Sequence, residues 1–101
     1  MKKQLSIITL VFLMGATGSS LAGDAAAGKT KYQQCSSCHG LTAQGVPNLG
    51  KKLADKDAVY LKNQIDAFKS GARTNPMMDG MAKTISDTDI ENLAAYFATL
   101  N

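Results

Sequence analysis

Two cysteines and a histidine lie within five residues of one another, and this cluster constrains the fold more than any other feature. They occupy the run Cys35-Ser36-Ser37-Cys38-His39. Residues three and four apart lie on the same face of a helix, so on a helix this run presents two thiols and one imidazole to one side. The chain contains no other cysteine and no other histidine. Any chemistry of this chain that needs a thiol or an imidazole therefore depends on these three side chains.

The C-x-x-C-H spacing is that of c-type haem attachment. Each thiol can add to one vinyl group of a haem, and the imidazole is then held close to the iron as an axial ligand. Three alternatives remain. A thioredoxin-like redox pair needs a βαβ context, a structural zinc site needs four ligands, and a disulfide here would close a loop too short to restrain the unfolded chain much. The adjacent histidine favours one haem, bound covalently through Cys35 and Cys38 with His39 as axial ligand.

The first 22 residues have the pattern of a secretory signal peptide. Lys2 and Lys3 precede an apolar run over 5–14, and small residues follow as far as Ala22. An uncleaved membrane anchor is the alternative, but the run is about half of the roughly 20 residues that a membrane helix needs. We expect residues 1–22 to be removed, a periplasmic location, no permanent membrane anchor, and a mature domain over 23–101.

A domain of this size buries little surface, so a cofactor is expected to complete its core. Its charge is close to balanced. Removing Lys2 and Lys3 from the 11 basic residues leaves 9 against 8 acidic ones, a net charge of +1. Lys51, Lys52 and Lys56 form a modest basic patch, interpreted as a solvated face, and no cluster suggests nucleic-acid binding.

Helical signals dominate the rest of the chain, and no alternating strand pattern follows residue 23. We expect three main helices, over 24–38, over 57–70 and from Ser86 onward, in an all-α fold. Apolar residues recur at helical spacing in the second and third, and Ser86 with Asp89 resembles a capping box. The intervening stretches, 41–56 and 72–85, are expected to be irregular and to wrap around the cofactor.

One glycine and three methionines do not fit a plain helical bundle. Gly28 costs its helix about 1 kcal/mol, which suggests close approach of another backbone. Met77, Met78 and Met81 lie in the stretch before the last helix. They are either flexible core filler or the source of a second axial ligand, which suits an electron carrier. An open axial site suits gas binding or peroxide chemistry instead.

Taken together, these motifs resemble the small bacterial class I cytochromes c, both the soluble mono-haem proteins and the repeated halves of di-haem ones. The resemblance covers nearly the whole mature chain. The C-x-x-C-H motif is highly specific, whereas the other segments are weaker one by one and consistent as a set. They are Gly40 after the motif, then Pro47-Asn48-Leu49, Tyr60-Leu61-Lys62-Asn63-Gln64-Ile65, Phe68-Lys69-Ser70-Gly71-Ala72-Arg73, Met77-Met78-Asp79-Gly80-Met81-Ala82 and Leu93-Ala94-Ala95-Tyr96-Phe97.

The resemblance implies roles for further residues. Met78 corresponds to the sixth iron ligand, with Met77 as its rival and Met81 as a weaker one. Pro47 corresponds to the proline whose carbonyl accepts the ring N–H of the haem-binding histidine, a bond that orients the imidazole and raises its basicity. Arg73 resembles an arginine near a haem propionate, and without the family it would equally be a solvated loop charge.

It also implies the architecture and the activity. Gly28 and Tyr96 correspond to the point where the first and last helices cross. The expected fold is the class I cytochrome c fold, with three main helices around one covalently attached haem. The expected function is single-electron transfer between redox protein partners, by a monomer or weak dimer that is not an enzyme. A haem subunit of a larger dehydrogenase or oxidase and a small-ligand sensor are the alternatives.

Overall fold

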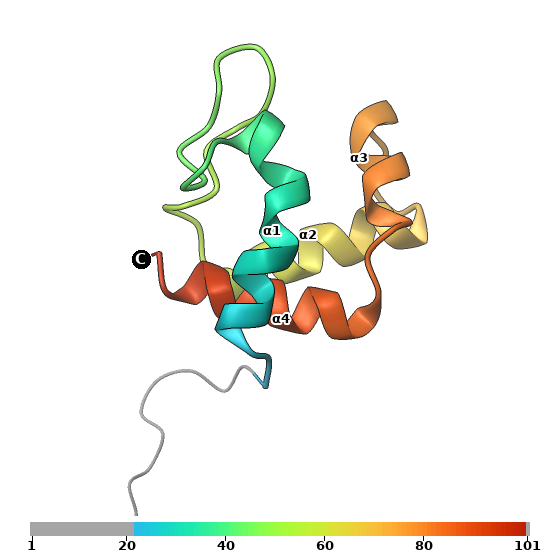
Figure 1. Ribbon diagram of the computed structural model, residues 1–101. Helices are drawn as coiled ribbons and strands as arrows, with labels where there is room; N and C mark the ends of the chain where they lie inside the picture. The colour runs from blue at the N-terminus through green and yellow to red at the C-terminus, as the bar shows by residue number, and fades with distance from the viewer. Residues whose placement is uncertain (1–21, 101) are drawn as a thin grey trace, which may run out of the picture.

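The computed structural model describes residues 22–100, which form four helices (Figure 1). They are α1 (Ala25–His39), α2 (Ala58–Ser70), α3 (Pro76–Ala82) and α4 (Asp87–Ala98). Within this range the only β-type pairing is an isolated bridge between Val46 and Gly50. The predicted all-α class is therefore confirmed. The predicted signal peptide, residues 1–22, lies outside the described residues except for Ala22.

Three helices begin within one residue of the predicted start, each directly after a capping side chain. Asp24 and Asp57 each accept two hydrogen bonds on a side-chain oxygen, from backbone N–H groups of the first turn. Ser86 and Asp89 form a full capping box, in which each side chain accepts from the other residue's backbone N–H at 3.0 Å. These bonds satisfy donors that the first turn of a helix would otherwise leave unpaired. Local sequence is thus enough to start α1, α2 and α4.

The third helix corrects the prediction that 72–85 is irregular. Pro76 is its first residue, where a proline's fixed φ and missing N–H cost nothing. The side chain of Asn75 caps it by accepting hydrogen bonds from the N–H groups of Met77 and Met78, each at 3.0 Å. With only seven residues and a glycine inside it, α3 is too short to show a helical period in the sequence.

The first and last helices cross at Gly28, as predicted. A Cβ at this position would overlap the backbone carbonyl of Asn92 and lie 2.9 Å from Cβ of Tyr96. Beside the crossing, the ring of Tyr32 packs on those of Tyr96 and Phe97, with centroids 5.4 and 5.9 Å apart. The glycine therefore allows the two backbones to meet, and the aromatic rings fill the space beside them.

The rest of the core lies between α2 and α4. Leu61 and Ile65 of α2 and Ile90 and Leu93 of α4 are buried in one cluster. The short helix α3 packs on α2, whereas α1 packs on α4, and α1 and α3 stand apart from each other in Figure 1. No helix among residues 22–100 is both long enough and apolar enough to cross a membrane.

Candidate functional site

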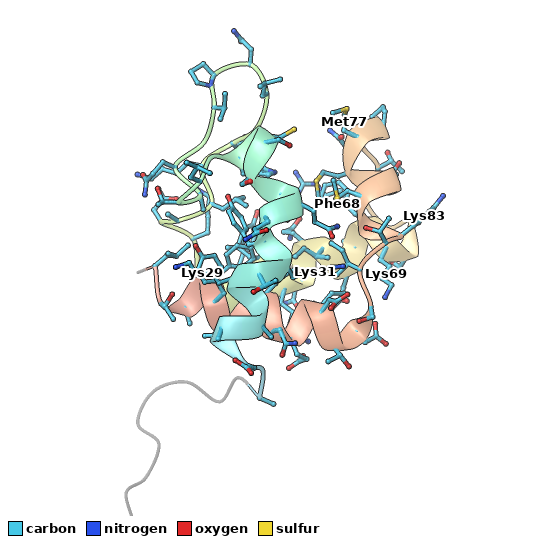
Figure 2. The ribbon with its side chains drawn as sticks, in the orientation of Figure 1. Lys29, Lys31, Phe68, Lys69, Met77 and Lys83 are labelled. Atoms are coloured by element: carbon cyan, nitrogen blue, oxygen red, sulfur yellow. The ribbon has the colours of Figure 1, made fainter. Side chains whose placement is uncertain are left out.

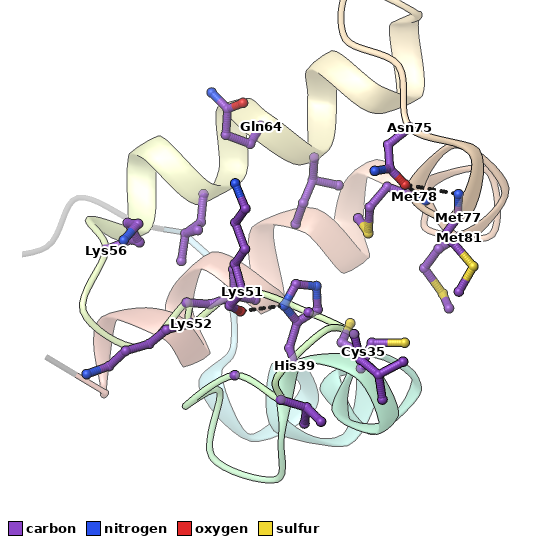
Figure 3. A pocket seen from close by; sticks show the side chains of 18 of the residues that line it. Cys35, His39, Lys51, Lys52, Lys56, Gln64, Asn75, Met77, Met78 and Met81 are labelled. Atoms are coloured by element: carbon purple, nitrogen blue, oxygen red, sulfur yellow. Dashed lines mark hydrogen bonds between the residues drawn. The ribbon is translucent and has the colours of Figure 1, made fainter.

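A cavity of about 900 Å³ opens between α1, α2, α3 and the loop that follows α1. This volume is near the upper end of the range found for ligand pockets, which is about 300–1,000 Å³. Six chemically distinctive residues line it, three from α1 on one side and three from α3 on the other (Figure 3). They are Cys35, Cys38 and His39, and Met77, Met78 and Met81. The cavity thus gathers the residues that the sequence singles out.

The two cysteines lie in the last turns of α1, half-buried and facing the cavity. Both are free thiols. Burial raises the pKa of Cys35 to about 11, the nearby Lys31 charge opposes that rise and Cys38 adds to it. Cys35 is therefore a protonated thiol at neutral pH. The helical spacing places both sulfur atoms on the same side as the imidazole, as predicted.

His39 is fixed by one hydrogen bond. Its Nδ1 lies 2.7 Å from the backbone carbonyl oxygen of Lys51 (Figure 3). A carbonyl can only accept, so Nδ1 donates its proton to it, and in the neutral ring Nε2 then carries a free lone pair. Such a bond orients a ligating histidine and raises its basicity. His39 therefore has the tautomer that an axial iron ligand needs.

This bond corrects the prediction for Pro47, whose carbonyl was expected to accept from His39. Val46 and Gly50 pair with each other through two backbone hydrogen bonds of 2.9 and 3.1 Å, which closes 46–50 into a tight turn. Pro47 lies in this turn, where it is exposed and lines the cavity. The chain then passes so close to α1 that a Cβ on Gly50 would lie 3.0 Å from Nδ1 of His39. The next carbonyl, that of Lys51, is the one within reach.

The three methionines differ in what holds them. Met77 is 68% exposed, and Figure 2 shows its side chain at the outer end of α3. Met81 packs on the core, and its sulfur accepts a hydrogen bond of 3.1 Å from the side chain of Gln34. Met78 is half-buried, and no hydrogen bond reaches its sulfur from any residue in 22–100. Met78 is thus the methionine with a sheltered and uncommitted sulfur, which supports its predicted role.

Gln34 is a site residue that the sequence analysis missed. It lines the cavity one position before Cys35, and its amide contacts both Met81 and Thr84. The contacts join residues 47 and 50 positions apart in the chain. No local pattern signals a pairing over that distance.

The charged residues that line the cavity are all cations: Lys51, Lys52, Lys56 and Arg73. The guanidinium of Arg73 lies over the ring of Phe68, 4.8 Å from its centroid, and donates a hydrogen bond to the side chain of Gln64. These two contacts hold the exposed side chain of Arg73 beside the cavity. The basic patch, interpreted from sequence as a solvated face, borders the site, and such a border suits a ligand with carboxylates.

The donor set fits a haem bound through two thioethers. Two thiols and an imidazole with a free Nε2 share one wall, a thioether stands on the opposite wall, and the remaining lining includes Leu61, Ile65 and Phe97. Within residues 22–100, no group of three or more His, Cys, Asp or Glu side chains is placed to hold a metal ion. The volume of the cavity and its apolar lining suit a large, mostly apolar group.

Comparison with known proteins identifies the family. The family model for cytochrome c matches residues 25–101. Cytochrome c4 of Pseudomonas aeruginosa is 40% identical over 95 residues, covering 92% of this chain and 47% of that protein. Cytochrome c-554(548) of Halomonas halodenitrificans is 40% identical over 81 residues, covering 77% of this chain and 98% of that protein.

A third relative carries a functional name, "thiosulfate dehydrogenase electron acceptor", in Stutzerimonas stutzeri. It is 38% identical over 86 residues, covering 75% of this chain and 40% of that protein. The chain thus spans about half the length or less of two of these relatives and nearly all of cytochrome c-554(548). From its motif, its four-helix all-α fold and these matches, the chain belongs to the cytochrome c family of bacterial class I proteins, whose cofactor is covalently attached haem c.

Proposed function

We propose that this chain is a periplasmic mono-haem cytochrome c that carries single electrons between redox proteins and catalyses no reaction of its own. The observation that supports it most strongly is the placement of Met78 across the cavity from His39. When bound, the haem supplies an iron that alternates between Fe(III) and Fe(II). If a histidine and a methionine held this iron, the site would suit electron transport and the reduction potential would be raised.

The protein's own residues hold and shield the group in this proposal. Cys35 and Cys38 would each hold the haem through one thioether bond, and Nε2 of His39 and the sulfur of Met78 would hold its iron. The Lys51 carbonyl keeps the imidazole in one orientation, and α3 is capped at its start by Asn75. Because both ligand-bearing segments are anchored, the site needs little rearrangement when its charge changes by one unit.

The partners follow from the same site. Electron carriers exchange electrons with other redox proteins, and one relative is named as the electron acceptor of a dehydrogenase. A dehydrogenase is therefore a reasonable class of donor for this chain. The haem subunit of a larger dehydrogenase or oxidase remains the second candidate, and it would copurify with that partner. A free carrier would run as a monomer or weak dimer on size exclusion.

A redox titration followed by absorption spectroscopy tests the proposal, using the exported, haem-loaded protein. We expect low-spin iron in both states and, in the oxidised state, the weak band near the red end that reports methionine ligation. Met78→Ala should abolish that band, and Met77→Ala, which alters the exposed neighbour, should keep it. A high-spin wild-type protein would favour a small-ligand sensor, and a band that survives Met78→Ala would refute Met78 as ligand.

Export has its own measurement. The intact mass of the protein purified from the periplasmic fraction should correspond to residues 23–101 plus one haem. A protein that still carries residues 1–22 and is found in the membrane fraction would instead support an uncleaved anchor.

A further inference from the structure

The side chain of Gln34 joins α1 to the segment that contains Met81 and Thr84. Its Nε2 donates to the sulfur of Met81 at 3.1 Å and to Oγ1 of Thr84 at 2.9 Å. An amide nitrogen carries two protons, so both bonds can form at once. The Thr84 hydroxyl in turn donates to the backbone carbonyl of Met81 at 2.8 Å. The amide of Gln34 therefore fixes both the sulfur of Met81 and the chain end of α3.

These hydrogen bonds matter because α1 and α3 do not pack on each other. The α1 helix packs on α4, and α3 packs on α2. Among residues 22–100, the bonds from Gln34 are the only hydrogen bonds, and there is no ion pair, between α1 and the segment 76–84. Within the described residues, Gln34 is thus the one side chain that links the wall carrying His39 to the segment carrying the methionines by hydrogen bonds.

These hydrogen bonds also distinguish two candidate ligands. Met78 and Met81 are three residues apart on α3, so their side chains share a face, and both line the cavity. A thioether sulfur is a weak acceptor, and that of Met81 is already occupied by Gln34 and packed on the core. The sulfur of Met78 has no such contact within the described chain.

We propose that Gln34 is a positioning residue whose amide holds Met81 and the end of α3 against α1, so that Met78 alone is presented opposite His39. The inference rests on the proposed function, because it concerns which methionine binds the iron. In this proposal Gln34 itself does not bind the haem or its iron. It determines which methionine reaches the iron and how firmly α3 is held.

Exogenous imidazole measures how firmly α3 presents its methionine, because imidazole must displace it from the iron. In the haem-loaded Gln34→Leu variant, two neutral hydrogen bonds are lost, and we expect imidazole to bind on the order of ten-fold more tightly. Gln33→Leu is the matched control, since Gln33 is exposed on the same helix and its side chain makes no hydrogen bond in the described structure. It should bind imidazole as the wild type does. Gln34→Glu, which keeps the length but loses the N–H donors, should shift in the same direction as Gln34→Leu.

A second measurement identifies the ligand itself. With methionine labelled by carbon-13 at the methyl group, the methyl that sits over the haem ring shows a large upfield shift in the reduced protein. We expect this shift for Met78 in the wild type and for no methionine in Met78→Ala. In the double variant Gln34→Leu with Met78→Ala, the released Met81 should acquire the shift in part of the population.

Two results would overturn the inference while leaving the carrier function intact. One is wild-type imidazole affinity in both Gln34 variants, and the other is a shifted Met81 methyl in Met78→Ala with Gln34 unchanged. A wild-type protein with no shifted methionine methyl would overturn the proposed function, and this inference with it.

Discussion

Gly28 of α1 lies directly against the backbone carbonyl of Asn92 in α4. This contact lies at the N-terminal end of α1, and the haem-binding run lies at the other end. Because α1 packs mainly on α4, the crossing determines the direction in which α1 delivers Cys35 and His39 to the cavity. A residue remote from the site thus helps to set its geometry.

Gly28→Ala is expected to lower the free energy of unfolding by about 1–3 kcal/mol, because the added methyl group meets backbone that cannot move aside cheaply. Urea unfolding of the haem-loaded protein measures this. Gly80→Ala is the matched control, since a Cβ there meets nothing within 4 Å, and alanine in a helix is favoured over glycine by up to about 1 kcal/mol. Equal midpoints for the two variants would refute the close crossing.

Tyr32 should control part of the alkaline stability. Burial, with Cys35 and Tyr96 adding, raises its pKa to about 12, against about 10 in an unfolded chain. The unfolded state then loses its proton first, so this contribution to stability is complete below about pH 10 and is lost as the pH rises toward 12. Tyr32→Phe should flatten the stability profile in that window.

The same substitution should also cost about 1 kcal/mol at pH 7, because the Tyr32 hydroxyl donates to the Gly40 carbonyl at 2.7 Å. Tyr60→Phe serves as control at pH 7, since Tyr60 is 48% exposed and its hydroxyl has no hydrogen bond in the described structure. Parallel profiles for wild type and Tyr32→Phe between pH 10 and 12 would contradict the buried, protonated phenol.

Gly50→Ala should loosen the imidazole of His39. The new methyl group would meet the carbonyl of Cys38 and Nδ1 of His39, which pushes the loop and its Lys51 carbonyl outward. The ring N–H of His39 should then exchange with solvent at least about ten-fold faster in a nuclear magnetic resonance measurement, since one hydrogen bond to a fixed group is lost. Leu49→Ala alters an exposed side chain of the same loop and should leave that exchange slow.

Each cysteine should account for one covalent bond to the haem. Cys35→Ala and Cys38→Ala should each retain haem after denaturation, with the shifted absorption maximum of a haem that has one free vinyl group. The double variant should release all of its haem on acid extraction. Full retention in the double variant, or complete loss in either single one, would contradict two thioether bonds.

Local sequence predicted much of this fold because its signals act over a few residues. The caps at Asp24, Asp57 and Ser86 begin three helices at the expected places. Gly28 indicated the crossing because a glycine inside a helix lets another backbone approach closely. The short helix α3 escaped prediction, since seven residues started by Asn75 and Pro76 show no period. The loop carbonyl that meets His39 was assigned one turn too early, at Pro47 instead of Lys51.

By itself, the sequence determined that two thiols and one imidazole share a helical face, since 3.6 residues per turn bring positions 35, 38 and 39 together. It also offered three methionines as candidates for the proposed second ligand. Only the tertiary structure distinguished these candidates, because Met77 is exposed, Met81 is hydrogen-bonded to Gln34 and Met78 is half-buried. The reason is physical: solvent exposure and a hydrogen bond across 47 positions depend on how the helices pack, and no local pattern encodes that packing.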